Sequence, residues 1–228
     1  MFIGHFAVGF ASKRIAPGAS LGALMVAPLF LDLLWPVLLA VGVEHVRIEP
    51  GATAVTPLDL YDYPYSHSLL GALLCSVAGA GIYYALGRDR RAAWVIAAGV
   101  LSHWVLDLVS HRPDMPLFPG GSTRLGLGLW NSIAGTVVVE GSMFAAGVAL
   151  YATCTRARDR RGGIGFWSYV VLLSLLWASD FFSPPPPSVR ALIATSFVGW
   201  IFVPWAWWLD RHRDARPQSF AAKAPSLS

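Results

Sequence analysis

Ionisable side chains interrupt the apolar segments of this chain, and one group of them has the spacing of metal ligands. The stretch SHWVLDLVSHRPDMP, residues 102–116, places His103, Asp107 and His111 at intervals of four residues. In an α-helix each such step turns the side chain by about 40°, so the three groups lie along one face. Imidazole and carboxylate groups bind zinc and related divalent ions, and an i, i+4 pair can hold one ion. A hydrogen-bonded structural pair is the alternative interpretation of His103 and Asp107.

Other ionisable residues in apolar surroundings are candidates for the same site. Asp32 lies in APLFLDLLWP and His67 in YPYSHSLL. Acidic groups within a bilayer are costly, so they normally face the protein interior. His5, in FIGHFAVGF, can join the site only if the N-terminal segment folds back into the bundle; otherwise it lies at the membrane interface. Glu140 and Asp62 are candidate general bases, although Glu140 could be a buried packing acid and Asp62 a ligand or a turn cap.

The composition indicates an integral membrane protein. The chain is 55% hydrophobic and 13% charged, whereas soluble domains carry about 25% charged residues. A helix needs about 20 apolar residues to cross a bilayer. Apolar runs of about this length lie at 18–43, 66–87, 92–110, 126–152, 166–182 and 189–209. We therefore predict an all-α integral membrane protein with about six transmembrane helices, preceded by a short apolar segment over residues 1–12.

The positions of the basic residues predict the topology. With six crossings and both termini in the cytoplasm, 13 of the 17 Lys and Arg residues fall on the inner side, as the positive-inside rule requires. The net charge of +4 is thus explained by topology, and no nucleic-acid partner is expected. We expect one polytopic domain over residues 1–210 in the inner membrane of a bacterial-type cell. Its metal-site half would cover about 1–120 and its accessory helices about 126–209, and 211–228 would be a polar, disordered tail.

This topology also brings the ionisable residues together. The first and third crossings run outward, and the second begins outside, so the polar residues of all three converge on the outer half of the bundle. Those residues are Asp32, His67, His103, Asp107 and His111. Because only Lys and Arg were used to set the topology, this convergence supports a shared site. Asp114 is expected in the loop beyond the membrane.

Four short motifs in order along the chain resemble those of the YdjM-like family of predicted membrane-bound metal-dependent hydrolases. They are GHFAVGF near the start, an Asp closing the first apolar run, SHS opening the second, and SHWVLD followed by PLFP. The resemblance covers roughly residues 1–120 and implies a hydrolase. The metal ligands that it implies are His5, Asp32, His67, His103 and Asp107. The order and types of these residues are similar to those of soluble zinc-dependent phospholipase C enzymes, which suggests a phosphoester of a lipid headgroup as substrate.

The chain departs from the family pattern at two positions. Phe30 stands where the family often has the first Asp of Pro-Asp-x-Asp, and Asp62 where it often has the first His of His-Arg-Gly-x-Thr-His-Ser. The pattern therefore does not support a second metal, although His111 and Asp62 could compensate. Glu140 and the last three crossings lie outside these motifs.

The leading hypothesis is a membrane-bound metal-dependent hydrolase that acts on a lipid or lipid-linked substrate near the outer face. Zinc is the expected metal, and its expected ligands are Asp32, His67, His103, Asp107 and either His5 or His111. Metal-activated water would attack the substrate, with Glu140 or Asp62 as proton acceptor. Two alternatives remain: a transporter that uses the buried His, Asp and Glu residues as an ion or proton path, and a non-catalytic membrane protein whose polar cluster fixes helix packing.

Overall fold

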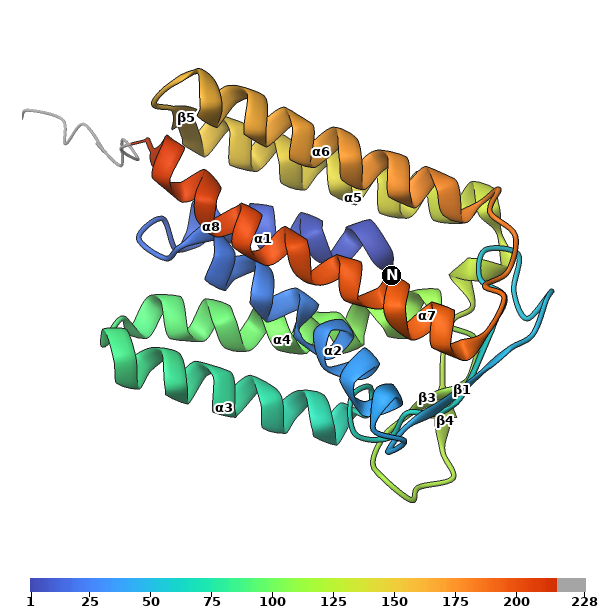
Figure 1. The fold of residues 1–228 in the computed structure, drawn as a ribbon. Helices are drawn as coiled ribbons and strands as arrows, with labels where there is room; N and C mark the ends of the chain where they lie inside the picture. The colour runs from blue at the N-terminus through green and yellow to red at the C-terminus, as the bar shows by residue number, and fades with distance from the viewer. Residues whose placement is uncertain (217–228) are drawn as a thin grey trace, which may run out of the picture.

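A computed structural model describes residues 1–216 of the chain and has the architecture of a polytopic membrane protein (Figure 1). Within these residues, six segments are long and apolar enough to cross a membrane. They are α2 (Leu21–Ala40), α3 (Leu69–Gly87), α4 (Arg90–Ser110), α5 (Ile133–Cys154), α6 (Arg160–Asp180) and the segment Val189–His212. The last segment consists of α7 (Val189–Ser196), the 3-10 helix η2 (Phe197–Ile201) and α8 (Phe202–His212). The predicted fold class and the six crossings are confirmed.

Each crossing begins at a side chain that caps the helix. A serine or aspartate oxygen accepts a hydrogen bond from the backbone N–H three residues further on, which satisfies a donor that the first turn leaves unpaired. The capping residues are Ser20, Ser68, Asp89, Ser132, Asp159 and Ser188. The cap at Ser132 also corrects a boundary, because the apolar run from residue 126 becomes helical only at Ile133. Before it, Gly128 takes a left-handed conformation with φ of +73° and begins the 3-10 helix η1 (Leu129–Asn131).

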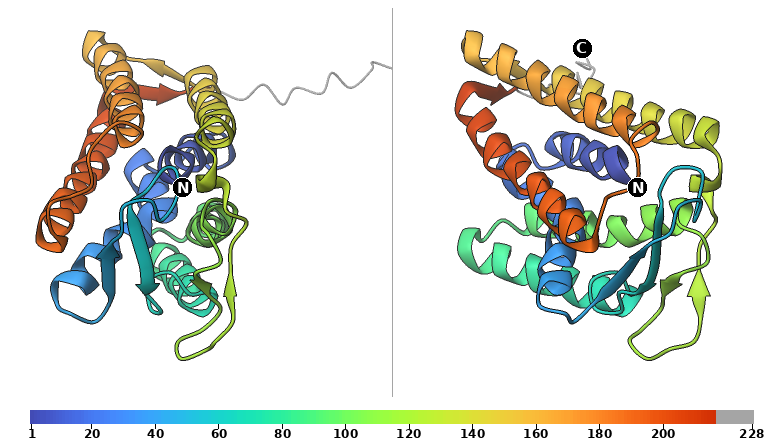
Figure 2. Two further views of the ribbon diagram at one scale, coloured as in Figure 1. Left: turned by 90° about the vertical axis from the view of Figure 1, so that its right-hand side faces the viewer. Right: turned by 45° about the vertical axis from the view of Figure 1, so that its right-hand side comes forward.

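The short N-terminal segment forms a buried helix that is shorter than a bilayer crossing requires. Helix α1 (Phe2–Ile15) is about 21 Å long by its rise per residue. It packs against α2, α4, α5 and α6 in the middle of the bundle (Figure 2). The segment therefore folds back into the protein, which decides between the two placements that the sequence leaves open for His5. Its close approach to α5 depends on Gly147, where a Cβ atom would lie 2.5 Å from the carbonyl oxygen of Ala7.

The two ends of the bundle differ in charge. At one end, here called the basic end, lie the α1–α2 turn, the α3–α4 turn and a two-stranded pair of β5 (Thr155–Ala157) with β6 (Arg213–Ala215) (Figure 1). Lys13, Arg88 and Arg158 are among the basic residues there. This separation of charge is the one that the positive-inside rule predicts for a cytoplasmic face.

The opposite end, here called the hairpin end, carries two small antiparallel pairs. Strand β1 (His45–Ile48) pairs with β2 (Leu58–Asp62), and β3 (Met115–Pro116) pairs with β4 (Arg124–Leu125). The long connection after the first crossing thus forms a hairpin that covers this end of the bundle (Figure 2).

The structured C-terminal part extends further than the expected boundary at residue 210. Helix α8 continues to His212, and β6 follows it. The guanidinium group of Arg213 explains this extension, because it donates to Thr155 Oγ1 at 2.9 Å and lies 4.6 Å from the ring centroid of Phe166. The remainder of the expected tail, 217–228, lies outside the described residues.

The packing at Gly147 leads to a prediction of stability. The substitution Gly147→Val should push α1 away from α5, since the new side chain would meet the backbone of Ala7, and overpacking of this kind typically costs about 1–3 kcal/mol. The matched control is Gly81→Val on α3, where an added Cβ meets nothing within 4 Å. Thermal unfolding in detergent should show a lower melting temperature for Gly147→Val alone. Equal melting temperatures for the two variants would contradict the close packing of α1 against α5.

The topology is tested by thiol labelling of spheroplasts in a background that lacks Cys75 and Cys154. Arg88→Cys and Arg158→Cys, at the basic end, should resist a membrane-impermeant reagent added from outside, whereas Arg124→Cys on β4 should react. All three positions are exposed, so burial does not explain a difference between them. Protection of Arg124→Cys with labelling of Arg88→Cys would reverse the predicted orientation.

Candidate metal centre

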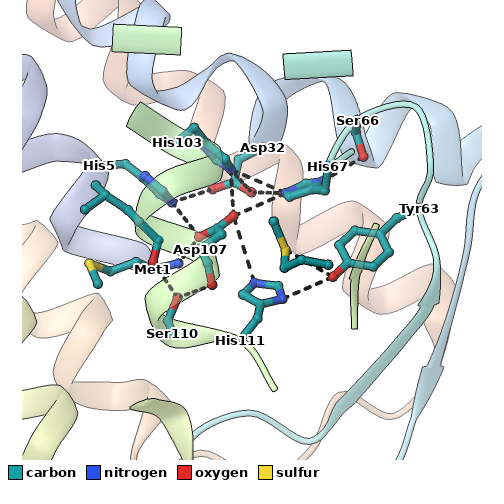
Figure 3. A network of polar contacts seen from close by, with 12 residues as sticks. Met1, His5, Asp32, Tyr63, Ser66, His67, His103, Asp107, Ser110 and His111 are labelled. Carbon is teal, nitrogen blue, oxygen red and sulfur yellow. Dashed lines mark hydrogen bonds and ion pairs between the residues drawn. The ribbon is translucent and has the colours of Figure 1, made fainter. Parts of the chain in front are cut away.

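Three elements bring four ligand atoms together at the hairpin end of the bundle. His103 and Asp107 lie on α4, Asp32 lies on α2, and His67 immediately precedes α3 (Figure 3). His67 Nε2 lies 3.3 Å from His103 Nε2, 3.4 Å from Asp32 Oδ1 and 3.7 Å from Asp107 Oδ2. His103 Nε2 lies 3.6 Å from Asp32 Oδ1 and 3.0 Å from Asp107 Oδ2. We call these four residues the four-ligand set.

The distances from the two histidines match the edges of a tetrahedral metal site. A zinc ion with bonds of about 2.0–2.1 Å sets its ligand atoms about 3.3–3.4 Å apart. The Nε2 atoms of His67 and His103 each lie 3.0 to 3.7 Å from the other three ligand atoms. Two imidazoles and two carboxylates also have the chemistry that zinc and related divalent ions prefer. The residues present therefore fit a divalent ion by both geometry and donor type.

The sequence prediction for α4 is borne out by the geometry of its side chains. His103 and Asp107 lie on one face, both fully buried. His103 Nδ1 lies 2.7 Å from the carbonyl oxygen of Pro28 on α2, which marks Nδ1 as the protonated nitrogen. Its Nε2 lone pair is then directed at the four-ligand set, as ligation requires.

A buried carboxylate that the sequence analysis missed orients His67. Glu44 is 1% exposed and accepts hydrogen bonds from the backbone N–H groups of Tyr65 and Ser66, both at 2.8 Å. Ser66 Oγ lies 2.6 Å from Glu44 Oε2 and 2.7 Å from His67 Nδ1. This relay holds the imidazole ring with Nε2 toward the four-ligand set. Glu44 begins a turn-rich connection, and its sequence context does not distinguish it from a solvated loop acid.

His5 joins the site from α1. Its Nε2 lies 3.1 Å from Asp107 Oδ1, and its ring stacks on that of His103 with centroids 3.9 Å apart and planes 3° apart. The amino group of Met1 also contacts Asp107 Oδ1 (Figure 3). The structure therefore brings His5 beside the other candidate ligands, and its role as a metal ligand stays a prediction.

His111 lies at the edge of the site and is held by residues outside it. Its Nε2 is 3.9 Å from Asp107 Oδ2, and its Nδ1 is 3.0 Å from Asp114 Oδ1. The hydroxyl of Tyr63 donates to the same oxygen of Asp114 at 2.7 Å. Burial and the Asp114 carboxylate hold the pKa of Tyr63 well above its usual value, so the hydroxyl stays protonated and remains a donor. Asp114 lies in the loop after α4, as expected, and orients His111.

The two candidate bases lie elsewhere. Asp62 is not brought to the four-ligand set, because its register on β2 places it opposite His45, whose Nδ1 lies 2.7 Å from its Oδ2. Both side chains are largely exposed. Glu140, on α5, is 1% exposed, and its Oε1 accepts a hydrogen bond from Trp130 Nε1 at 3.2 Å. Its Oε2 has no hydrogen-bond partner among the described residues.

A cavity of about 130 Å³ opens beside the four-ligand set. Its polar wall includes Asp32, whose side chain is 43% exposed and faces the cavity, together with His67, Asp107 and His111. Its apolar wall comes from α1, α2, the β1–β2 hairpin and η1, through Phe2, Trp35, Leu58, Leu60 and Trp130. Lysine and arginine are absent from the described lining residues. The groups beside its two carboxylates that can carry positive charge are the amino group of Met1, which also lines the cavity, and the imidazoles of His67 and His111.

A comparison with protein-family models identifies the family. The model described as the YdjM inner membrane protein matches residues 64–182. The chain belongs to the YdjM inner membrane protein family. The YdjM match extends from His67 through α4 to the end of α6, so it runs beyond the half of the chain on which the resemblance rested, while Asp32 and His5 precede it. Together with the six apolar spans, it supports a multi-pass location in the inner membrane.

Comparisons with curated proteins and with solved structures found no match to this chain.

The relay behind His67 predicts an effect on metal affinity. Glu44→Gln and Ser66→Ala should each weaken zinc binding by about 10- to 100-fold, because removal of the group that orients a ligating histidine typically costs that much. Glu49→Gln is the matched control, since Glu49 is exposed on the same connection. Competition titration against a zinc chelator measures the affinities. If the three variants and the wild type bind zinc equally, the relay has no such role.

Proposed function

We propose that this YdjM family member is a membrane-bound metal-dependent hydrolase that cleaves a lipid or lipid-linked substrate, foremost a phosphoester. The observation that carries the proposal is that His67 and His103 lie within 3.0–3.7 Å of each other and of the carboxylates of Asp32 and Asp107, beside a cavity. In the proposed topology, the cavity lies toward the outer face of the inner membrane. Residues 1–120 would supply the ligands, and the helices over 126–209 would support them within one membrane domain ending near residue 210.

The four-ligand set would hold the ion, with zinc as the expected metal. A divalent ion bound there supplies a Lewis acid that generates a nucleophile from water at neutral pH and polarises a phosphoryl or acyl oxygen. Asp32 lies at the cavity wall, so the open side of the site faces the space where a substrate would enter. The buried side is closed by α4, where His103 is fully enclosed.

His111 is the residue best placed to orient the attacking water. It lines the cavity, and Asp114 and Tyr63 hold its Nδ1 side, so that Nε2 is directed toward the four-ligand set. At 3.9 Å from Asp107 Oδ2, this nitrogen can accept a hydrogen bond from a water molecule near the ligands. Glu140 remains a candidate proton acceptor, although it does not line the cavity.

The walls of the cavity favour an amphiphilic substrate with a small polar headgroup. A volume of about 130 Å³ is close to that of a cavity that admits benzene, about 150 Å³, so it suits a headgroup and excludes a whole lipid. Trp35, Leu58 and Trp130 would contact the apolar part of the substrate near the mouth. Because no lysine or arginine lies in the described lining, the negative charge of a phosphate would be balanced chiefly by the bound ion.

The arrangement of the apolar core favours a site open to one side over an ion path through the membrane. Between His5 and the basic end, α1 presents Phe6 and Phe10, which pack against Tyr169 and other aromatic residues. A proton or ion path toward the basic end would have to cross this apolar region. The transporter hypothesis therefore gains no support from the packing.

The proposal is tested by metal analysis and lipid turnover of the purified full-length chain in detergent, without chelators. Wild type should carry stoichiometric metal and release headgroup or phosphate from a panel of phospholipids and lipid-linked phosphates in mixed micelles. His103→Ala and Asp107→Ala should lose both metal and turnover. His45→Ala is the control and should retain both, because His45 pairs with Asp62 on the exposed hairpin.

The outcomes separate the alternatives. Wild-type protein without metal would refute the metal site and the hydrolase together. Metal without turnover of any member of the panel would refute the hydrolase and favour a binding or structural role.

A further inference from the structure

The carboxylates of Asp107 and Asp32 each point their two oxygens at different partners. Asp107 directs Oδ2 at His67 and His103, and directs Oδ1 at His5 Nε2, 3.1 Å away, and at the amino group of Met1. Asp32 directs Oδ1 at His67 and His103, while its Oδ2 lies 4.0 Å from His5 Nε2. The oxygens that do not belong to the four-ligand set therefore both face His5.

We propose that His5 Nε2, Asp107 Oδ1 and Asp32 Oδ2 form a second divalent-cation site beside the first, with both carboxylates bridging the two ions. This inference rests on the proposed function and extends it from a one-ion to a two-ion centre. Three protein ligands leave room for water or substrate at the second ion, as in catalytic metal sites generally.

The stacked histidines give the spacing that two neighbouring ions need. The parallel rings of His5 and His103 have centroids 3.9 Å apart and direct their Nε2 atoms at different oxygens of Asp107. Two-ion hydrolytic sites have their ions about 3.5–4 Å apart. Parallel ligands separated by this distance therefore suit one ion each better than a single shared ion.

Charge at this position supports a cation independently of the distances. The amino group of Met1 lies there, and the carboxylates of Asp107, Glu140 and Asp32 all act on it electrostatically. Glu140 is buried and one of its oxygens lacks a hydrogen-bond partner among the described residues. One divalent ion would balance only two of the three carboxylates, and a buried uncompensated carboxylate is costly. The remaining negative charge can be balanced by a second metal ion, by the Met1 ammonium or by a proton on Glu140, and a count of bound ions separates the first from the other two.

This second site differs from what the sequence pattern suggested. Phe30 and Asp62 occupy the positions where the family often has further acidic and histidine residues, and Asp62 is paired with His45 on the hairpin. The donors proposed here come instead from α1 and from the second oxygens of two ligands that already serve the first site. A two-ion centre suits displacement at a phosphoester, where both the attacking and the leaving oxygen need stabilisation.

The test uses the full-length chain in detergent, stripped with a chelator, reloaded with Mn²⁺ and freed of excess ion. Elemental analysis should find two ions per wild-type chain, and electron paramagnetic resonance should show magnetic coupling between them. His5→Ala should retain one ion with the spectrum of an isolated Mn²⁺. His45→Ala should behave as wild type, because its side chain is remote from the ligands.

Two results would overturn the second site. One ion per wild-type chain would mean that no second ion is bound: if His5→Ala leaves that ion in place, the Met1 ammonium or a proton balances the remaining charge, and if His5→Ala loses it, His5 is a ligand of the single ion. Two ions without magnetic coupling would mean that they are not neighbours. A single bound ion refutes the second site but not the proposed function, whereas a wild-type chain that binds no ion refutes both. If His5→Ala does not purify as a monodisperse protein, His5→Gln replaces it, and the wild-type count and spectrum decide by themselves.

Discussion

The burial of the Asp107 carboxylate is the constraint on which this structure depends. The side chain is almost completely enclosed within a bundle of apolar spans and meets only the small cavity beside the site, so bulk water hydrates little of it. A carboxylate in such surroundings needs positive charge and hydrogen bonds from the protein or from a bound ion. Residues of α1, α4 and the segment before α3 all direct nitrogen atoms at it. The polar contacts at one aspartate thus fix the relative positions of elements that lie far apart in the sequence.

Helix α1 shows how the rest of the bundle accommodates this cluster. Its first turn carries His5 to Asp107, and its remaining turns present Phe6 and Phe10 to an apolar core shared with α5, α6 and α8. At the basic end, Lys13 closes the helix by donating to Asp210 at 2.9 Å and to the carbonyl oxygen of Ala19 at 2.7 Å. The helix therefore joins a polar half at the hairpin end to an apolar half at the basic end. This division confines the polar chemistry to one side of the membrane domain.

The features that the sequence predicted best depend either on residues close together in the chain or on properties averaged over many residues. Composition and the distribution of arginine predict the crossings, and the i, i+4 spacing predicts the shared face of His103 and Asp107. Residues fixed by loop geometry were not predictable in this way. Asp62 and Tyr63 are neighbours, yet the pairing of β2 with β1 directs Asp62 to His45 and leaves Tyr63 buried beside His111. A one-residue change of strand register would exchange their roles, and nothing in the local sequence sets that register.

The four histidines of the site differ in how their rings are held in position. Three of the four histidines in the site have their Nδ1 atoms fixed by specific partners: a backbone carbonyl for His103, the Ser66–Glu44 relay for His67, and Asp114 for His111. His5 Nδ1 has no such partner among the described residues, and the ring is positioned by stacking and by the packing of α1. The four-ligand set is therefore a rigid site maintained by hydrogen bonds, whereas the position of His5 depends on how α1 fits against Gly147. In the proposed two-ion centre the second site would depend on the packing of this helix, so that changes remote from the candidate ligands would reach it through α1.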